Sequence, residues 1–429
     1  MLSSSQDLRG FCVDRLVVGS NIYEGTCVSI SNGVTVGLAS DLKGALDLRG
    51  LGSIAIPGVM DIHVHLRGLD LSYKEDEASG TLAALSGCIV AVVDMPNTKP
   101  PLKTVKALRA KLEALQANAY VDYGVYAGIP EDEDIVWSLA KEPVAGFKIY
   151  PEDMRVRRGI LCNVLKALEY KGGILIVHAE HPDLLGVDYG FDRTIYRSCV
   201  VESSAVDEIK KLLVECGSRP RVHITHASCH STILKAKEYG FTVDVTPHHL
   251  LFDMDNFKPL NSTWCESKVN PPLRDLVERS LLWKLLLEGY VDAIASDHAP
   301  HARFEKLWLH PSQCSPGFPS LEDWVGTLSL VFHRLNLLPL FTELTSLGPA
   351  RILGFKPWGF TGSKAYFTIL STDVEISHEP VFSKAKISPY LNKPKLRCLA
   401  TLIRGRLAYL NGEVMVGRGF GVNLFEAGG

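Results

Sequence analysis

The sequence predicts an α/β protein whose main part is a (β/α)8 barrel of the TIM type, with a small accessory β domain formed from both chain ends. Segments typical of strands and helices alternate about eight times between residues 57 and 356. Several of the strand segments are near-continuous apolar runs, for example residues 174–177, which is typical of parallel strands covered on both faces. About eight such β/α units are the number that closes a barrel.

The elements of the barrel are assigned from apolar runs, helical periodicity and the turn residues between them. The expected strands lie at 58–65, 89–95, 121–129, 145–150, 173–179, 221–227, 242–247 and 291–297. The expected helices lie at 77–86, 104–117, 132–140, 156–170, 201–214, 231–239, 276–288 and 321–335.

The accessory domain is predicted from short β segments at both ends of the chain. These segments lie at 11–18, 26–30 and 34–38, and again at 366–370, 381–387, 398–403 and 414–416. Because the N-terminal group is too short for a domain alone, the simplest prediction is that the two groups combine. We therefore expect an accessory β domain from residues 1–56 plus 357–429, beside a barrel domain at 57–356.

Composition and charge exclude several kinds of partner. The chain has 429 residues, a formal net charge of -3 and no dense run of basic residues, so neither nucleic acid nor an anionic membrane is an expected partner. No apolar run approaches the roughly 20 residues of a spanning helix, and the N-terminus lacks a basic segment followed by an apolar one. We expect a cytoplasmic protein that acts on a small molecule.

The ten cysteines are scattered singly, with no Cys-x-x-Cys pair that would indicate a structural zinc or redox site. Most of them are therefore expected to be buried thiols. Disulfides stay open as an alternative, because intracellular disulfides occur in hyperthermophiles and the sequence does not identify its host.

His63 and His65 are the first candidate metal ligands. They lie in an expected strand, where alternate side chains face the same way, so both imidazoles lie on one face. An isolated His-x-His pair fits two separately hydrogen-bonded histidines equally well. Asp61, two residues before His63, is expected to accept a hydrogen bond from a ligating imidazole.

The ends of other expected strands supply further candidates. In a barrel of this type the active site is built at the carboxyl ends of the strands. The polar residues found there are Asn97, Lys148, His178, His226 and Asp297, in addition to the two N-terminal histidines. The four histidines, Asp297 and Lys148 among them form a set of ligands for two metal ions, provided that the lysine can act as a ligand.

Two arrangements are open for the side chain of Lys148. A lysine ammonium has no lone pair to offer a metal, so this side chain either forms a salt bridge elsewhere or is carboxylated by CO₂ and bridges two metal ions. Its neighbours in the segment 146–150 are mostly apolar, and an unpaired buried lysine is costly. The second arrangement is therefore favoured.

Ten stretches together resemble one family. They are residues 61–67, 94–98, 146–150, 178–180, 223–228, 246–250, 270–274, 296–301, 316–322 and 382–384. In this order they resemble the dihydroorotases, a cyclic amidase group of the amidohydrolase superfamily. The His-x-His motif alone indicates only a metal-dependent hydrolase, whereas the ordered combination is specific.

The resemblance implies a dinuclear zinc site. His63, His65 and Asp297 would hold one Zn²⁺, and His178 and His226 the other. Carboxylated Lys148 and a hydroxide would bridge the two ions, and Asp297 would act as general base and then as general acid. His223, three residues before His226, is expected to support the site or the core rather than to bind metal.

The resemblance also implies a set of substrate contacts. Arg67, Asn97 and His301 would bind the carboxylate of the substrate, and Asn270 would meet its amide edge. Arg67 lies one alternation beyond His65 and is expected on the same face, where its guanidinium can bind a carboxylate with two hydrogen bonds. The alternative for Arg67 is a surface salt bridge.

The expected reaction is the reversible, zinc-dependent hydrolysis of the cyclic amide of (S)-dihydroorotate, or the cyclisation of N-carbamoyl-L-aspartate, in de novo pyrimidine biosynthesis. One alternative is another cyclic amidase, an allantoinase or a dihydropyrimidinase. The other is a catalytically inactive homologue that acts as a scaffold for aspartate transcarbamoylase. A homodimer and an association with aspartate transcarbamoylase stay open.

Overall fold

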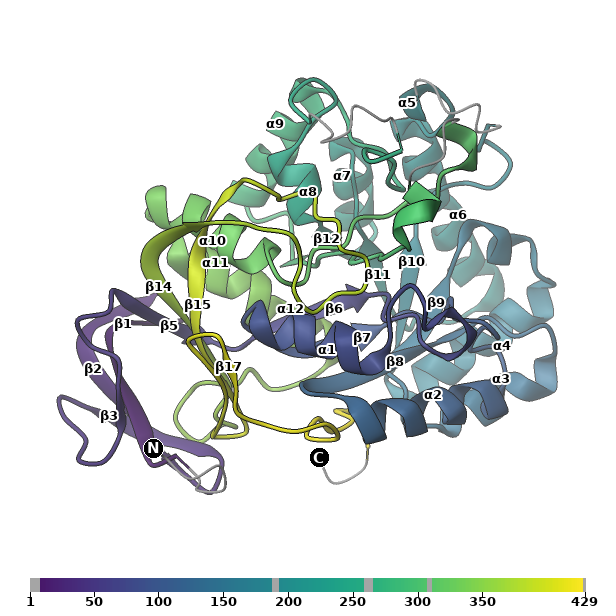
Figure 1. The fold of residues 1–429 in the computed structure, drawn as a ribbon. Coiled ribbons are helices and arrows are strands. Elements are labelled where there is room, and N and C mark those ends of the chain that lie inside the picture. Colours follow the sequence, from purple (N-terminus) through teal and green to yellow (C-terminus); the bar gives the residue numbers. More distant parts are fainter. Residues whose placement is uncertain (1–7, 187–192, 258–264, 307–310, 427–429) are drawn as a thin grey trace.

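The computed structural model describes residues 8–186, 193–257, 265–306 and 311–426. Two β-sheets organise these residues, one of eight strands and one of nine. Figure 1 shows the eight-stranded sheet surrounded by helices, with the other sheet to one side of it. The predicted fold class, a (β/α)8 barrel with a small β sheet from the chain ends, is confirmed.

The eight-stranded sheet is the barrel, and its strands are parallel and follow one another in chain order. They are β6 (Val59–Val64), β7 (Ile89–Asp94), β8 (Asp122–Gly128), β9 (Gly146–Ile149), β10 (Ile174–His178), β11 (Arg221–Thr225), β12 (Thr242–Val245) and β13 (Ala293–Ile294). Beyond β13, a parallel bridge between Val64 and His298 joins the last segment to the first strand. The His65 amide donates to the His298 carbonyl there at 2.8 Å, so the barrel closes next to the His-x-His pair.

Helices cover the outside of the barrel (Figure 1). The longer ones are α1 (Glu77–Ser86), α2 (Val105–Asn118), α3 (Glu133–Lys141), α4 (Arg158–Lys171), α6 (Cys199–Cys216), α7 (His230–Glu238), α9 (Leu276–Leu287) and α10 (Trp324–Arg334). All eight fall on predicted helices. Asp76 is the N-cap of helix α1. Its carboxylate accepts a hydrogen bond from the Ser79 amide at 2.7 Å in a capping box, so a local signal fixes the start of this helix.

Shorter helices were not predicted. They are α5 (Arg193–Tyr196), α8 (Pro247–Leu251), α11 (Leu338–Thr342) and α12 (Gly348–Leu353). Each has six residues or fewer, which is too short to show helical periodicity in the sequence.

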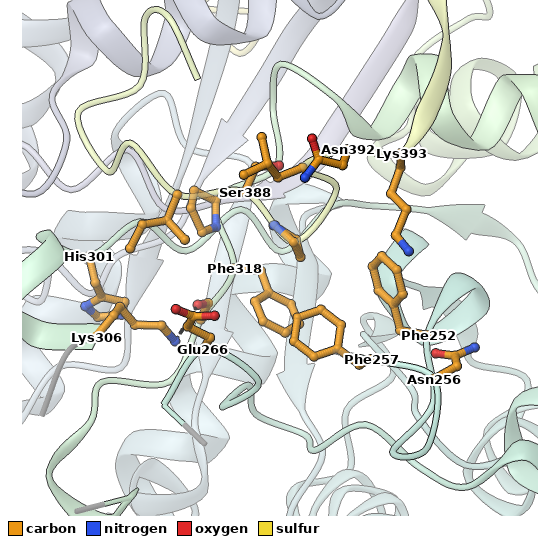
Figure 2. Close-up of a pocket in the computed structure, with 15 residues that line it drawn as sticks. Phe252, Asn256, Phe257, Glu266, His301, Lys306, Phe318, Ser388, Asn392 and Lys393 are labelled. Atoms are coloured by element: carbon orange, nitrogen blue, oxygen red, sulfur yellow. Dashed lines mark hydrogen bonds between the residues drawn. The ribbon is translucent and has the colours of Figure 1, made fainter. Parts of the chain in front are cut away.

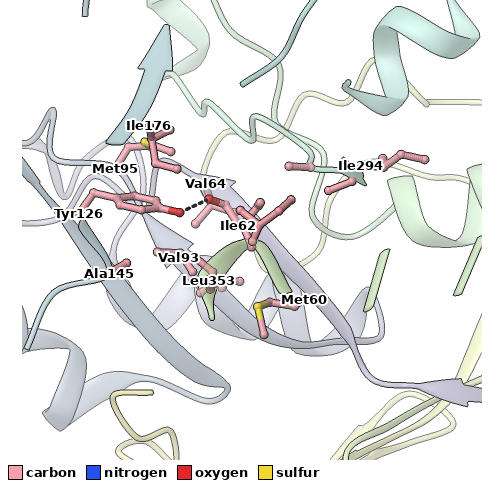
Figure 3. Packing of buried hydrophobic residues seen from close by; sticks show 14 of the residues in the cluster. Met60, Ile62, Val64, Val93, Met95, Tyr126, Ala145, Ile176, Ile294 and Leu353 are labelled. Atoms are coloured by element: carbon pink, nitrogen blue, oxygen red, sulfur yellow. Dashed lines mark hydrogen bonds between the residues drawn. The ribbon is translucent and has the colours of Figure 1, made fainter. Parts of the chain in front are cut away.

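Buried apolar side chains pack against the strands of the barrel (Figure 3). Ile62 and Val64 of β6 alternate with His63 and so lie on the opposite face of the strand, toward the surrounding helices, whereas Ile176 of β10 lies on the same face of its strand as His178. The Tyr126 hydroxyl donates to the Ile62 carbonyl at 3.2 Å. A filled barrel leaves no channel along its axis, so the chemistry is confined to the mouth.

The nine-stranded sheet combines both chain ends. Its strands are β1 (Gly10–Val18), β2 (Asn21–Ser31), β3 (Val34–Ala39), β4 (Leu46–Asp47), β5 (Ser53–Pro57), β14 (Phe367–Ile376), β15 (Pro394–Ile403), β16 (Arg406–Leu410) and β17 (Glu413–Val414). N-terminal β5 pairs with C-terminal β14, and Figure 1 shows the purple and yellow ribbons together. These strands support the proposed division into residues 1–56 plus 357–429 and residues 57–356, which stays a proposal.

Gly58 is the single residue between β5 of one sheet and β6 of the other, because β5 ends at Pro57 and β6 begins at Val59. A Cβ atom on Gly58 would lie 2.6 Å from a Val90 methyl carbon and 3.0 Å from the Tyr366 Cβ. A larger residue would therefore push the sheets apart at the start of the strand that carries His63 and His65.

One predicted strand is wrong. Residues 381–387 form no strand, because the carboxylate of Glu322 accepts hydrogen bonds from the amides of Val381, Phe382 and Ser383 at 2.8–2.9 Å. Amides that point at one carboxylate cannot donate to a neighbouring strand. The segment is therefore a loop held against the barrel.

The expectation that most cysteines are buried thiols is also wrong. All ten pair, as Cys12–Cys27, Cys88–Cys398, Cys162–Cys216, Cys199–Cys229 and Cys265–Cys314. Four of the pairs are separated by 15 to 54 residues, and Cys88–Cys398 by 310. Because the partners come from different elements, spacing along the chain did not indicate the pairing.

Within the part of the chain that the structure describes, no helix has the length and apolar character that a membrane crossing requires.

Candidate active site and metal centre

A cavity of about 260 Å³ lies at the mouth of the barrel, and we call it the active-site cavity. Its lining includes eight of the residues predicted from the sequence, namely His63, His65, Arg67, Asn97, His178, His226, Asn270 and Asp297. They come from five different strand ends and one long loop, as the barrel prediction requires. The other two predicted residues, Lys148 and His301, do not line this cavity.

His63, His65 and Asp297 form a compact group. The Asp297 Oδ1 atom lies 3.2 Å from His63 Nε2 and 3.0 Å from His65 Nε2. The second nitrogen of each ring forms a hydrogen bond to another side chain: His63 Nδ1 lies 2.5 Å from Thr225 Oγ1, and His65 Nδ1 lies 2.6 Å from Asn97 Oδ1. Both Nε2 atoms therefore face the carboxylate, in the spacing of three ligands around one metal ion.

His226 and His178 continue the cluster. The ring of His226 lies 5.2 Å from that of His63 and 4.4 Å from that of His178, between centroids. Burial, with a further contribution from neighbouring cationic groups, holds the pKa values of His63 and His226 well below the usual value, so both imidazoles are neutral. Neutral imidazole is the form that binds metal.

His178 is oriented by an acidic neighbour. Its Nε2 atom lies 2.6 Å from Glu180 Oε2, and the same oxygen accepts from the Arg197 guanidinium. This contact leaves Nδ1 as the nitrogen of His178 that is available to a metal. Glu180 and Arg197 also line the active-site cavity, and sequence reasoning assigned neither of them a role.

Lys148 is completely buried at the end of β9. Its Nζ atom has no hydrogen-bond partner among the described residues, and burial lowers its pKa to about 7. An unpartnered amine in such a place is unfavourable, whereas an anionic carboxylated lysine among metal ions would be stabilised. The four histidines, the aspartate and this orphan lysine therefore fit a pair of divalent metal ions.

Asp244 of β12 supports this cluster and was missed from the sequence. Its carboxylate accepts from His223 Nε2 at 2.8 Å, from Thr225 Oγ1 at 2.9 Å and from the His226 amide at 2.5 Å. Because Thr225 contacts His63, one carboxylate positions two candidate ligands. The available signal was an acidic residue within the otherwise apolar run 243–245, since a buried carboxylate needs partners.

Asp61 does not act as expected. Its Oδ1 atom accepts hydrogen bonds from the amides of His63 at 3.3 Å and Ser296 at 3.0 Å, and no imidazole of the described residues donates a hydrogen bond to the carboxylate. The carboxylate therefore ties the backbone of β6 to the segment that carries Asp297. Burial raises the pKa of Asp61 to about 7.

Arg67 reaches the active-site cavity by a different path from the one predicted. Strand β6 ends at Val64, so alternation does not extend to Arg67, which has a left-handed backbone with φ +58°. Its guanidinium donates to the Pro300 carbonyl at 3.2 Å and lies 3.3 Å from His301 Nε2. Arg67 is buried, which contradicts the alternative of a surface salt bridge.

The other predicted substrate contacts have protein partners. Asn97 Oδ1 contacts the His65 ring, and Asn270 Oδ1 accepts from the Arg193 guanidinium. His301 lies between the active-site cavity and a second cavity of about 180 Å³, seen in Figure 2. Phe252, Phe257 and Phe318 pack together along that second cavity, with ring centroids 5.2 and 5.5 Å apart.

Lys306 also lies beside the second cavity (Figure 2). Its ammonium donates to the carbonyls of Lys268, Ser315 and Gly317 at 3.0–3.1 Å. Residues 316 and 317 form part of the wall of the active-site cavity. Lys306 therefore holds that wall in place.

Comparisons with known proteins agree with this site. Residues 52–147 match a family model described as dihydro-orotase-like. The dihydroorotase of Aeropyrum pernix is 46% identical over 418 residues, which cover 96% of this chain and 97% of that protein. The dihydroorotase of Saccharolobus solfataricus is 38% identical over 379 residues, covering 87% of this chain and 89% of that protein.

Solved structures share the fold. The L-hydantoinase (dihydropyrimidinase) of Arthrobacter aurescens superposes with a TM-score of 0.85 at 24% identity, covering 96% of this chain and 99% of that one. The dihydropyrimidinase of Brevibacillus agri gives the same TM-score at 20% identity, covering 97% and 98%.

The barrel, its cluster of imidazoles and carboxylates and these relatives define the chain as an enzyme of the cyclic amidohydrolase class. Enzymes of this class depend on metal ions and act on small molecules. The chain belongs to the dihydroorotase family, which confirms the family predicted from its motifs.

Proposed function

We propose that this enzyme hydrolyses the cyclic amide of (S)-dihydroorotate to N-carbamoyl-L-aspartate and catalyses the reverse cyclisation, as a step of pyrimidine biosynthesis. The observation that carries the proposal is the convergence of four imidazoles, Asp297 and the unpartnered Lys148 at one barrel mouth. The names of its full-length relatives support the choice of substrate.

The same residues would hold two Zn²⁺ ions. His63, His65 and Asp297 would bind one ion, and His178 and His226 the other, with carboxylated Lys148 between them. For this modification the neutral lysine amine adds to the carbon of CO₂ and loses one proton, which yields a carbamate anion. When bound, the metal ions supply an activated water near neutral pH and polarise the amide carbonyl.

Arg67 would orient the substrate. Its buried guanidinium lies at the edge of the active-site cavity, where it can bind the ring carboxylate with two charge-assisted hydrogen bonds. Allantoin and dihydrouracil lack this ring carboxylate, so Arg67 favours dihydroorotate over the substrates of an allantoinase or a dihydropyrimidinase. His301, 3.3 Å from the guanidinium, would complete the carboxylate site together with Asn97.

Asp297 would carry the proton. As the water oxygen bonds to the amide carbon, the carboxylate accepts one water proton, and it then donates that proton to the ring nitrogen as the carbon–nitrogen bond breaks. Asn270 would meet the amide edge of the ring. Glu180 and Asp244 hold His178 and His226 during the reaction and transfer no proton.

The test is a set of steady-state assays on dihydroorotate, allantoin and dihydrouracil with zinc-loaded enzyme. Turnover of dihydroorotate that is lost on chelation and restored by zinc is the expected result. Activity confined to allantoin or dihydrouracil would overturn the proposed substrate. A folded preparation that takes up no zinc and turns over none of the three would instead support the inactive scaffold.

The modification of Lys148 has its own test. Enzyme reconstituted with zinc and carbon-13 bicarbonate should show one carbamate carbon signal per chain, and Lys148→Met should lack it. An unmodified Lys148 in protein that holds two zinc ions would refute this part of the proposal.

The cytoplasmic location expected from the sequence stays a proposal, and a homodimer and an association with aspartate transcarbamoylase are proposals that rest on the family alone. Light scattering of the purified protein, with and without added aspartate transcarbamoylase, tests the last two.

A further inference from the structure

The loop that carries Arg67 has an unusual backbone. Arg67, Gly68 and Leu69 all have positive φ values, of +58°, +67° and +48°. Two of the three are not glycine, and a left-handed backbone at such a residue is strained. It persists only where the surrounding structure holds it, so something beside this loop must do so.

Lys111 of α2 is a side chain that holds this loop from beside it. Its Nζ atom donates to the Arg67 carbonyl at 3.1 Å. The same atom forms ion pairs with Glu77 Oε1 at 2.6 Å and with Asp94 Oδ2 at 2.8 Å. Lys111 and Asp94 are completely buried, and Glu77 nearly so.

The two carboxylates connect this lysine to the barrel. Asp94, at the end of β7, accepts the Leu66 amide at 2.8 Å through its other oxygen. Glu77 lies in the first turn of α1. One buried cluster of Lys111, Glu77 and Asp94 thus holds both the Leu66 amide and the Arg67 carbonyl.

Its two carboxylate partners stabilise the buried ammonium of Lys111. Although burial opposes the charged form, Asp94 and Glu77 raise the pKa of Lys111 above its usual value. The cluster therefore holds one ammonium between two carboxylates, with a formal charge of -1. Its side chains do not line the active-site cavity, so it acts on the site only through the backbone of residues 66 and 67.

We propose that Lys111 is a positioning residue for substrate recognition, which holds the Arg67 backbone so that its guanidinium lies ready for the substrate carboxylate. This inference rests on the proposed function of Arg67 and extends it to a residue on another element. Lys111 touches neither substrate nor metal ligand in this role. Its loss should weaken recognition of the carboxylate and leave the metal centre intact.

The test uses the double variant Lys111→Met with Glu77→Gln. It removes one positive and one negative charge, so the buried charge of -1 on Asp94 and its hydrogen bond to Leu66 are kept. A matched control is Lys395→Met with Glu375→Gln. Lys395 is a mostly buried lysine, 2.9 Å from Asp323 and 3.5 Å from Glu375, that does not line the active-site cavity.

We expect the KM for dihydroorotate to rise about 10- to 100-fold in the Lys111 variant, with kcat within about threefold of wild type, because a small misplacement of a binding group has effects of this size. Bound zinc should be unchanged, and the control variant should keep its KM. In an Arg67→Met background the Lys111 change should add less than about threefold, because its effect acts through Arg67.

Two kinetic results would overturn the inference: an unchanged KM in a folded Lys111 variant, or effects of the Lys111 and Arg67 changes that multiply. A crystal structure of the Lys111 variant gives a readout that does not depend on activity. Loss of the left-handed Arg67 backbone supports the inference, and its retention contradicts it. Wild-type enzyme without activity on dihydroorotate would refute the proposed function, and the crystal structure would still decide the role of Lys111.

Discussion

Replacing Asp244 by asparagine tests whether one carboxylate organises the metal centre. The carboxylate accepts three hydrogen bonds, two on Oδ2 and one on Oδ1, and it is buried. An asparagine amide has only one oxygen, so at least one donor loses its acceptor and faces an NH₂ group. A lost hydrogen bond to a charged group costs about 1.5–3 kcal/mol, and the remaining bonds weaken, so we expect a loss of about 2–4 kcal/mol in unfolding free energy.

The second consequence of Asp244→Asn concerns zinc. Asp244 fixes the His226 backbone directly and His63 through Thr225, and removing such a support weakens metal binding by about 10- to 100-fold. Urea unfolding of metal-free protein measures the first effect, and zinc retained at graded concentrations of a chelator measures the second.

The control for Asp244 is Asp253→Asn. Asp253 is equally buried and accepts the amides of Asp255 at 2.9 Å and Asn256 at 2.7 Å, and it does not line the active-site cavity. This variant should lose stability but keep its zinc affinity. If Asp244→Asn binds zinc as wild type does, the carboxylate serves only the fold, and our account of the ligand support is refuted.

Three further variants test the site itself. Asp297→Asn should stay folded and keep at least one zinc ion, while kcat falls by about 10²- to 10⁴-fold because the proton carrier is lost; unchanged turnover would refute that role. Arg67→Met should lower kcat/KM for dihydroorotate by an amount that corresponds to about 2–4 kcal/mol of lost binding free energy, the cost of a lost charge-assisted pair, with zinc content unchanged. Lys148→Met should reduce bound zinc from two ions to at most one per chain in elemental analysis, and a variant that still holds two would show that no lysine bridge is needed.

Most of the barrel could be predicted because its signals are local. Apolar runs bounded by turn residues predict seven barrel strands to within two residues at either end, and helical periodicity predicts the eight longer helices. The last strand is shorter than expected, Ala293–Ile294 instead of 291–297. After Ile294 the pairing is reduced to the isolated bridge between Val64 and His298, and Asp297 takes a left-handed backbone with φ +48° that brings it to the active-site cavity.

The site could be predicted only as far as strand ends reveal it. Alternation and strand position placed His63, His65, His178, His226 and Asp297 around one cavity, as expected. The groups that hold these ligands lie on other elements, so their roles depend on contacts that no spacing along the chain expresses. Asp244 is 18 residues from the His226 amide that it accepts, and Lys111 is 44 residues from the Arg67 carbonyl.

The disulfide between Cys88 and Cys398 closes a large covalent loop of the chain. It joins the turn before β7 of the barrel to β15 of the other sheet, and the 310-residue separation encloses most of the barrel. A protease that cuts one peptide bond between these two cysteines therefore cannot release a fragment until the bridge is reduced. The nicked enzyme should migrate as a single species on a non-reducing gel and separate into two fragments on a reducing one.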